Sequence, residues 1–300
     1  MQSVLMIFLD GVGIGNEDYQ SNPFFKYGFK TFTEVFREIP SLRNQYLKRN
    51  NSYIFPVDAR LGMDGFPQSG TGQTSIFCGM NAAQFVGKHF GPYPYSTLIP
   101  VIREKNIFKE VLSLGKKSFF ANAYPKRFFD YIKSGHSRLS VTSLSCRLSG
   151  LRLNTSSDVR KGKALTAEIT NERWNEKLGY KLRQIKPETA ARRLLKIAAE
   201  NSFTLYEYFL TDHLGHGRYD GDAQNLLKIL DEFLLTIIKE LYDNMTLIIC
   251  SDHGNIEDIS VKTHTLNPSL AIASGVHAEE LSKEIKDLTQ IKPAIMKILK

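Results

Sequence analysis

The feature that most constrains the fold is a short apolar run followed directly by two polar side chains. Residues 245–250 are apolar and β-branched without helical spacing, and Asp252 and His253 come just after them. Such a run is typical of a buried strand in a parallel sheet, and open α/β sheets bind ligands beyond their carboxyl strand ends. A carboxylate and an imidazole there suit a divalent cation. The alternative is that Asp252 caps a turn and His253 is a hydrogen-bonded surface histidine.

The rest of the chain alternates between strand-like and helix-like segments, which predicts an α/β fold. A mostly parallel central sheet would then be covered by helices on both faces. The expected strands are residues 4–9, 118–123, 203–210, 245–250 and 269–273. The expected helices are residues 31–38, 97–114, 141–148, 164–177, 222–241 and 283–300, with an amphipathic helix beginning at Pro187.

Length and charge set the domain organisation and the classes of partner. A chain of 300 residues buries a substantial core, and we expect a single domain over residues 1–300. Residues 101–190 carry 19 Lys and Arg against 8 Asp and Glu. This basic stretch is either a solvated face or faces an anionic partner. Because it carries no known nucleic-acid-binding motif, we expect no nucleic-acid partner. Its irregular part, residues 124–185, is the place for a small lid.

The cysteines and apolar runs indicate the compartment. Cys78, Cys146 and Cys250 are far apart and odd in number, so neither a disulfide framework nor a cysteine zinc site is expected. No apolar run approaches the length of a membrane span, and the first residues do not read as a secretory signal. We therefore expect a cytoplasmic protein without a membrane partner.

Further candidate ligands follow other predicted strands. Asp10 ends the strand at residues 4–9, and Asp212 and His216 lie four residues apart beyond the strand at 203–210, a spacing that brings side chains together in one helical turn. A Gly/Ser/Thr-rich loop, residues 65–74, opens an apolar helix. Such a helix start binds anions, and either Ser69 or Thr71 there is a candidate nucleophile or an ordinary cap. Lys88 and His89 in the next loop are candidate substrate contacts.

Taken together, these motifs resemble the alkaline phosphatase superfamily. The matching features, in the family's order, are Asp10-Gly11, the Ser69 loop, Asp212-x-x-x-His216, Ser251-Asp252-His253-Gly254-Asn255 and His264-Thr265-x-Asn267-Pro268. They are most similar to the cofactor-independent phosphoglycerate mutase and phosphopentomutase branch. The resemblance implies an alkaline phosphatase-like three-layer α/β sandwich.

The resemblance also implies two divalent metal ions, manganese or zinc, and a role for each motif. One ion would be held by Asp212, His216 and His264, and the other by Asp10, Asp252, His253 and the nucleophile. The family's pattern points to Ser69 as that nucleophile, with Thr71 as the alternative. Gln73 stands where the family usually has a histidine, which is a departure from the pattern.

The size of the predicted lid separates two reactions. Similar mutases carry a large cap after the nucleophile helix, whereas the span from Ser69 to Asp212 must also hold core elements and leaves room for a small lid only. We therefore expect a phosphohydrolase of phosphomonoesters or phosphodiesters that acts on a small phosphorylated substrate through a phosphoserine or phosphothreonine. The alternative is a phosphomutase, and a non-catalytic binding module is a third possibility. Substrate identity and oligomeric state are not indicated by the sequence.

Overall fold

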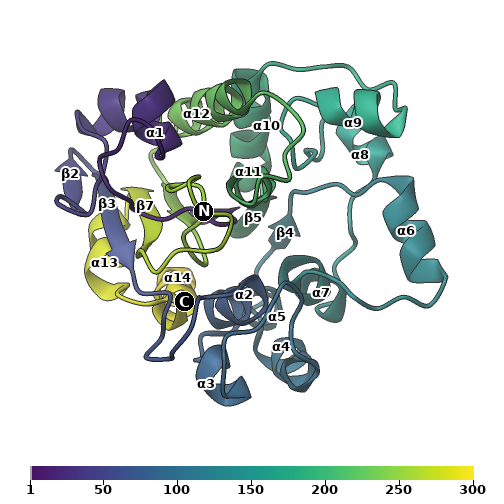
Figure 1. Cartoon of the computed structure of the whole chain (residues 1–300). Coiled ribbons are helices and arrows are strands. Elements are labelled where there is room, and N and C mark those ends of the chain that lie inside the picture. Colours follow the sequence, from purple (N-terminus) through teal and green to yellow (C-terminus); the bar gives the residue numbers. More distant parts are fainter. Residues whose placement is uncertain (1) are drawn as a thin grey trace.

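A seven-stranded sheet forms the centre of the protein, as a computed structural model of residues 2–300 shows (Figure 1). The strand order is β2-β3-β7-β6-β1-β5-β4. The strands are β1 (Ser3–Leu9), β2 (Leu47–Arg49), β3 (Ser52–Val57), β4 (Ser118–Phe120), β5 (Phe203–Tyr208), β6 (Met245–Cys250) and β7 (Ser269–Gly275). Four neighbouring strands, β6, β1, β5 and β4, run parallel, while β7 pairs antiparallel with both β6 and β3. The sheet is therefore mixed, with its parallel part at β1.

Strand β1 lies in the middle of the parallel part and is buried along its whole length. Its side chains alternate between two cores: Val4, Met6 and Phe8 point to one face of the sheet, and the intervening residues point to the other. A strand covered on both faces needs apolar residues at every position, which explains the unbroken apolar run.

Helices cover both faces of this sheet and make three layers (Figure 1). One face is packed by α2 (Ser69–Cys78), α4 (Ile99–Lys105), α5 (Ile107–Ser113), α7 (Val141–Leu148), α13 (Ala278–Glu284) and α14 (Ile291–Leu299). The opposite face is packed by α1 (Pro23–Tyr27), the π-helical turn Thr31–Phe36, α10 (Pro187–Ala199) and α12 (Ala223–Lys239). The short helix α3 (Ala82–Val86) packs against α2, and the short helix α11 (Leu210–Gly215) follows β5 directly.

A third, smaller apolar cluster lies in the segment predicted to be a lid. It contains Val159, Ala164, Trp174 and Leu182, beside α6 (Lys126–Lys133), α8 (Ser156–Arg160) and α9 (Glu172–Leu178). Figure 1 shows these three helices on one side of the molecule, away from the layers on the sheet. That they act as a lid over residues 124–185, and that residues 1–300 are one domain, stay predictions.

Most predicted elements are present, with corrections at four helices. The segment expected at 283–300 contains the end of α13, a 3-10 turn at Leu288–Gln290 and then α14 from Ile291. The helix expected at residues 97–114 is broken at Asn106, whose side chain caps α5 by accepting from the N–H of Lys109 at 3.1 Å. The one expected at 164–177 begins only at Glu172, and the one at 31–38 is a π-helical turn. The hairpin of β2 and β3 was not predicted. None of the helices within residues 2–300 has both the length and the hydropathy needed to cross a bilayer.

Candidate metal centre

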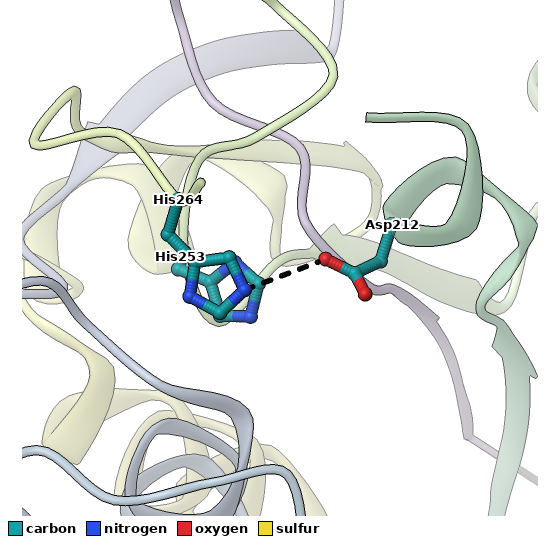
Figure 2. Close-up of side chains that lie close together, drawn as sticks. All are labelled: Asp212, His253 and His264. Carbon is teal, nitrogen blue, oxygen red and sulfur yellow. Dashed lines mark ion pairs between the residues drawn. The ribbon is translucent and has the colours of Figure 1, made fainter. Parts of the chain in front are cut away.

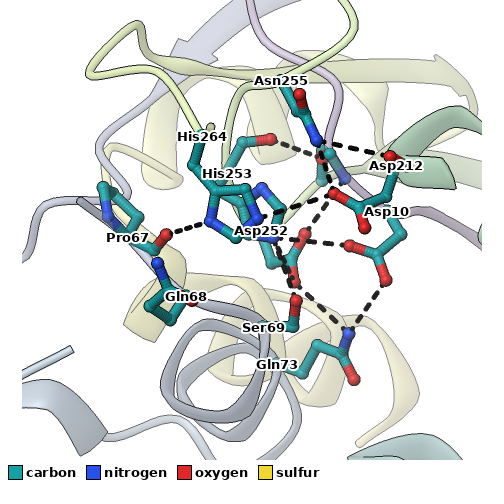
Figure 3. Close-up of polar contacts among 12 residues, drawn as sticks. Asp10, Pro67, Gln68, Ser69, Gln73, Asp212, Asp252, His253, Asn255 and His264 are labelled. Carbon is teal, nitrogen blue, oxygen red and sulfur yellow. Dashed lines mark hydrogen bonds and ion pairs between the residues drawn. The ribbon is translucent and has the colours of Figure 1, made fainter. Parts of the chain in front are cut away.

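Three carboxylates meet at the carboxyl edge of the parallel strands. Asp10 follows β1 and Asp252 follows β6, while Asp212 lies in α11 just after β5. Because β6, β1 and β5 are adjacent, their ends deliver the three side chains to one place. Residues separated by up to 242 positions in sequence are thus neighbours (Figure 3).

Asp212, His216 and His264 form the first ligand group. The Nε2 atoms of His216 and His264 are 3.1 Å apart, and they lie 3.3 Å and 3.6 Å from Asp212 Oδ1. Each ring donates through Nδ1 to a backbone carbonyl, His216 to Lys262 at 2.8 Å and His264 to Pro67 at 2.6 Å. In the neutral rings both Nε2 atoms therefore carry lone pairs, and they point at one another and at a carboxylate. Such converging acceptors fit a cation between them.

Within this ligand group, Asp212 and its histidine neighbours affect one another's pKa. Burial by itself would raise the pKa of Asp212, but hydrogen bonds with His216 and His264 outweigh it and lower that pKa. The hydrogen bond with Asp212 raises the pKa of His216 in turn. Asp212 is also held by Asn255, whose Nδ2 donates to Oδ1 at 2.7 Å. The carboxylate is therefore kept ionised and oriented toward the two histidines.

Asp10, Asp252 and His253 form the second ligand group. His253 Nε2 lies 3.4 Å from Asp10 Oδ1 and 3.5 Å from Asp252 Oδ2. Burial, followed by the charge of Asp252, raises the pKa of Asp10 well above its usual value, while burial and the charge of Asp212 raise that of Asp252 to about 7. Burial lowers the pKa of His253 to about 3, so the ring is neutral and cannot balance the two acids.

His253 connects the two groups. Its ring stacks on that of His264 with centroids 3.7 Å apart, and Figure 2 shows both rings facing Asp212. One nitrogen each of His253 and His264 and one oxygen of Asp212 lie within 4.8 Å of one another, as do the ligand atoms of the second group. The sequence placed His253 with the second group alone, whereas the structure places it between both.

The donor set of the second group fits a divalent cation. Asp10 Oδ1 is buried and has no hydrogen-bond partner among residues 2–300. Two buried carboxylates beside a neutral imidazole repel each other unless positive charge is supplied. Oxygen and imidazole nitrogen are ligands shared by manganese and zinc. The fit therefore supports divalent ions without choosing between these two metals.

Ser69, the first residue of α2, faces this centre. Its Oγ lies 3.1 Å from His253 Nε2 (Figure 3). Thr71 has a different environment, because its hydroxyl donates to the carbonyls of Gln68 and Phe90 at 3.2 Å and 3.4 Å and accepts from the N–H of Phe90 at 3.1 Å. Of the two candidate nucleophiles, the serine is thus the one near the ligand groups, whereas the threonine ties α2 to the Phe90 loop.

Gln73, one turn further along α2, also points into the site. Its Nε2 donates to Asp10 Oδ2 at 3.4 Å and to Asp252 Oδ2 at 3.3 Å. The close approach of α2 depends on Gly72, where an added Cβ would lie 3.0 Å from the Cβ of Asp252. The residue that departs from the family's pattern is therefore a neighbour of the second ligand group.

The loops that carry the ligands are joined by Glu257, which sequence reasoning missed. This buried carboxylate accepts at 2.8 Å from the N–H groups of Gly13 and Asn255. Its other oxygen accepts from the hydroxyl of Thr265 and from Asn267 Nδ2. A Cβ on Gly13 would lie 2.5 Å from Glu257 Oε1, so that approach requires glycine. No local pattern marks Glu257, because its partners are scattered along the chain.

A cavity of about 360 Å³ opens at Ser69, Asp212, His216 and His264. Two cationic residues, Arg218 and Lys262, also line it, and sequence reasoning did not single them out. Lys88 and His89 are not among its lining residues. His89 is instead held by the backbone near Met63, and burial lowers its pKa. The structure thus does not bring the two predicted substrate contacts to this cavity.

Comparison with known families gives a match over the second half of the chain. A family model described as the Metalloenzyme superfamily matches residues 170–300. That segment contains five of the candidate ligands, which are Asp212, His216, Asp252, His253 and His264. No curated protein matches the chain.

Solved structures share the fold along nearly the whole chain. The PH0037 protein from Pyrococcus horikoshii superposes with a TM-score of 0.56 at 13% identity, covering 99% of this chain and 96% of that one. Alkaline phosphatase from the Antarctic bacterium TAB5 gives 0.54 at 13% identity, covering 99% and 97%. The predicted alkaline phosphatase-like α/β fold is confirmed, while the likeness to the mutase branch stays a prediction.

Proposed function

We propose that this chain, which has the alkaline phosphatase fold and matches the Metalloenzyme superfamily over residues 170–300, is a metal-dependent phosphoryl-transfer enzyme. Its proposed reaction is the hydrolysis of phosphate esters through a covalent phosphoserine at Ser69. The observation that carries the proposal is the position of Ser69 Oγ, 3.1 Å from the histidine that the two ligand groups share. A nucleophile beside two convergent acceptor groups is the arrangement that in-line phosphoryl transfer requires.

Each ligand group would hold one divalent ion, manganese or zinc. Asp212, His216 and His264 would hold the first, and Asp10, Asp252 and His253 the second together with Ser69. Bound divalent cations supply positive charge that neutralises phosphoryl oxygens and favours the ionised form of a serine hydroxyl. Asn255 and the backbone carbonyls of Lys262 and Pro67 fix the ligand orientations.

The side chains of this protein account for the remaining steps. Ser69 loses its hydroxyl proton as Oγ forms a bond to phosphorus, while the bond from phosphorus to the ester oxygen breaks and that oxygen takes up a proton to leave as the alcohol. Water then attacks the phosphoserine, the Oγ–P bond breaks, a proton from the water returns to Oγ, and inorganic phosphate leaves. Arg218 and Lys262, which line the cavity, would attract the phosphate charge. His253 is neutral and adds no positive charge at Ser69 Oγ, so the charge that favours ionisation of this hydroxyl would come from the bound cations.

The test compares Ser69→Ala with Thr71→Ala in a phosphate-release assay and by trapping the phosphoenzyme after acid quenching. We expect S69A to lose the phosphoenzyme and to lower kcat by roughly 10³-fold or more. T71A should keep the phosphoenzyme, although its stability falls with the lost contacts to the Phe90 loop. Metal content measured in parallel shows whether a variant has lost the ions. A phosphoenzyme that survives in S69A but disappears in T71A would contradict the assignment.

The same assay separates hydrolase from mutase. A hydrolase releases one inorganic phosphate for each ester consumed, whereas a mutase returns the phosphoryl group to a second hydroxyl of the same substrate. A phosphoenzyme without phosphate release, accompanied by an isomerised ester, would therefore favour the phosphomutase.

A further inference from the structure

A second cavity, of about 480 Å³, lies between α6, α9 and the end of β5. Its walls are largely aromatic, and they include Tyr124, Phe128, Tyr131, Trp174 and Phe209. Its size is within the range of small-molecule binding sites. None of these five residues belongs to the ligand groups described above, so the metal centre does not explain the cavity.

One carboxylate, Glu207, lines this aromatic cavity. Its side chain is 5% exposed, and Oε2 accepts from the Thr142 hydroxyl at 2.8 Å. Oε1 has no hydrogen-bond partner among the described residues. An oxygen of a buried acid that is left unpaired in a cavity is expected to pair with a ligand donor or with water. The cavity therefore offers aromatic walls and a buried carboxylate acceptor, with the exposed cation Arg127 also in its lining.

The aromatic cavity lies beside the metal centre. Glu207 on β5 is paired in register with Phe8 on β1, so the two side chains share one face of the sheet. Asp10, two residues after Phe8, points to that same face, where it meets Gln73 of α2. The charge of Glu207 contributes to the raised pKa of Asp10, as expected for neighbouring acids. Glu207 therefore lines the aromatic cavity and is also a neighbour of Asp10 in the metal centre.

Helix α6 contributes two aromatic side chains, Phe128 and Tyr131, to the wall of the cavity. None of its residues is fully buried, and Phe128 also packs against the edge of a main core. The Phe128 ring is stacked on that of Tyr124 with centroids 4.1 Å apart. Half-buried aromatic rings keep a surface on which another planar ring can stack.

We propose that this cavity binds a planar aromatic ring carrying an N–H or O–H donor, which is the alcohol part of the ester cleaved at Ser69. The donor would bond to Glu207 Oε1, and the ring would pack among Phe128, Tyr131 and Trp174. The link to the ester rests on the proposed function, whereas ring binding stands on the cavity alone. Nucleosides have this chemistry, because the base keeps its N–H donors when the ribose carries the phosphate, and adenosine is a suitable probe.

Ring binding is testable without any turnover, because Trp174 is the single tryptophan of the chain and lines the cavity. Titrating the full-length, metal-containing protein with adenosine at pH 8, where Glu207 is ionised and can accept, should quench its fluorescence saturably. Purine riboside, which lacks the exocyclic amine, should bind roughly tenfold more weakly. Phe128→Ala should weaken adenosine binding roughly tenfold. Phe129→Ala, the control on the same helix, is partly buried and outside the cavity lining, and should bind within about twofold of wild type.

Turnover then tests the link to the ester. The ratio of kcat/KM for adenosine 5′-monophosphate to that for glycerol 3-phosphate should fall roughly tenfold in F128A and stay unchanged in F129A. Equal binding of adenosine by F128A and wild type, or no saturable quenching, would overturn the ring site. If both esters release phosphate but adenosine does not quench the fluorescence, the ring site is contradicted and the proposed function still stands. Quenching that F128A weakens, with release from neither ester, would support the ring site and contradict the Ser69 chemistry.

Discussion

At the scale of single residues, the metal centre depends on side chains that hold other side chains. Glu257 accepts four hydrogen bonds and so fixes the loops after β1 and β6 and the segment that carries His264. Asn255 holds Asp212, and two backbone carbonyls set the proton positions of His216 and His264. Outer groups of this kind hold ligands in place and tune their affinity for metals.

Replacing Glu257 by glutamine should show this role directly. Each oxygen of the Glu257 carboxylate accepts two hydrogen bonds, and an amide NH₂ in place of either oxygen cannot accept them. Two buried N–H or O–H donors would then be left without a partner. We expect the free energy of unfolding to fall by about 2–4 kcal/mol and metal affinity to fall roughly 10- to 100-fold. Urea unfolding and metal titration measure the two effects. Glu279→Gln, which removes an exposed pair with Lys283, is the control and should leave the free energy of unfolding nearly unchanged. Equal losses in both variants would contradict the role.

At the scale of elements, β4, β5 and α7 are joined by polar side chains. β4 has only three residues, and the Asn122 side chain continues its pairing by bonding both the N–H and the carbonyl of Glu207 at 2.8 Å. The Glu207 side chain then reaches Thr142 in the first turn of α7. Burial raises the pKa of Glu207 to about 7, above its ordinary value of 4.5. This junction is therefore sensitive to pH.

The sign of that pH dependence follows from the raised pKa. Between pH 4.5 and about 7 the folded chain holds a proton on Glu207 that the unfolded chain has released, so stability falls as pH rises. The expected loss is about 3 kcal/mol, fully absent below pH 4.5 and complete above pH 7. Glu207→Gln should lack this loss. Urea unfolding of both proteins at pH 5 and pH 8 measures it, and an unchanged difference between them would contradict the assignment.

At the scale of the whole molecule, the sheet gathers ligands that span residues 10 to 264. The two main apolar cores lie on opposite faces of the sheet, and the parallel strands all end at the edge that carries the ligand loops. Since each proposed ion would be bound by residues from several segments, metal binding stabilises the arrangement of the loops as well as the reacting groups.

Chelation should therefore lower the stability of the entire fold. With free metal at 100 times its Kd, one site contributes about 2.7 kcal/mol, which a chelator removes. Thermal unfolding before and after chelation, then with added manganese or zinc, measures the effect and identifies the ion that restores it. Asp252→Asn, which removes one charged ligand, should show a smaller response. A melting temperature that chelation leaves unchanged in the wild type would contradict the proposed sites.

The sequence by itself determined five of the seven strands, most helices and the candidate ligands, because those signals are local. The run at β6 and the bounds of α7 follow from apolar patterning, and the chemistry of Asp252 and His253 follows from residue type. Only the tertiary structure decided which groups meet. The place of His253 between both ligand groups, the partners of Glu257 and the approach of Ser69 in preference to Thr71 depend on contacts between distant segments. Such contacts produce no periodic pattern in the sequence, because they join segments that are far apart along the chain.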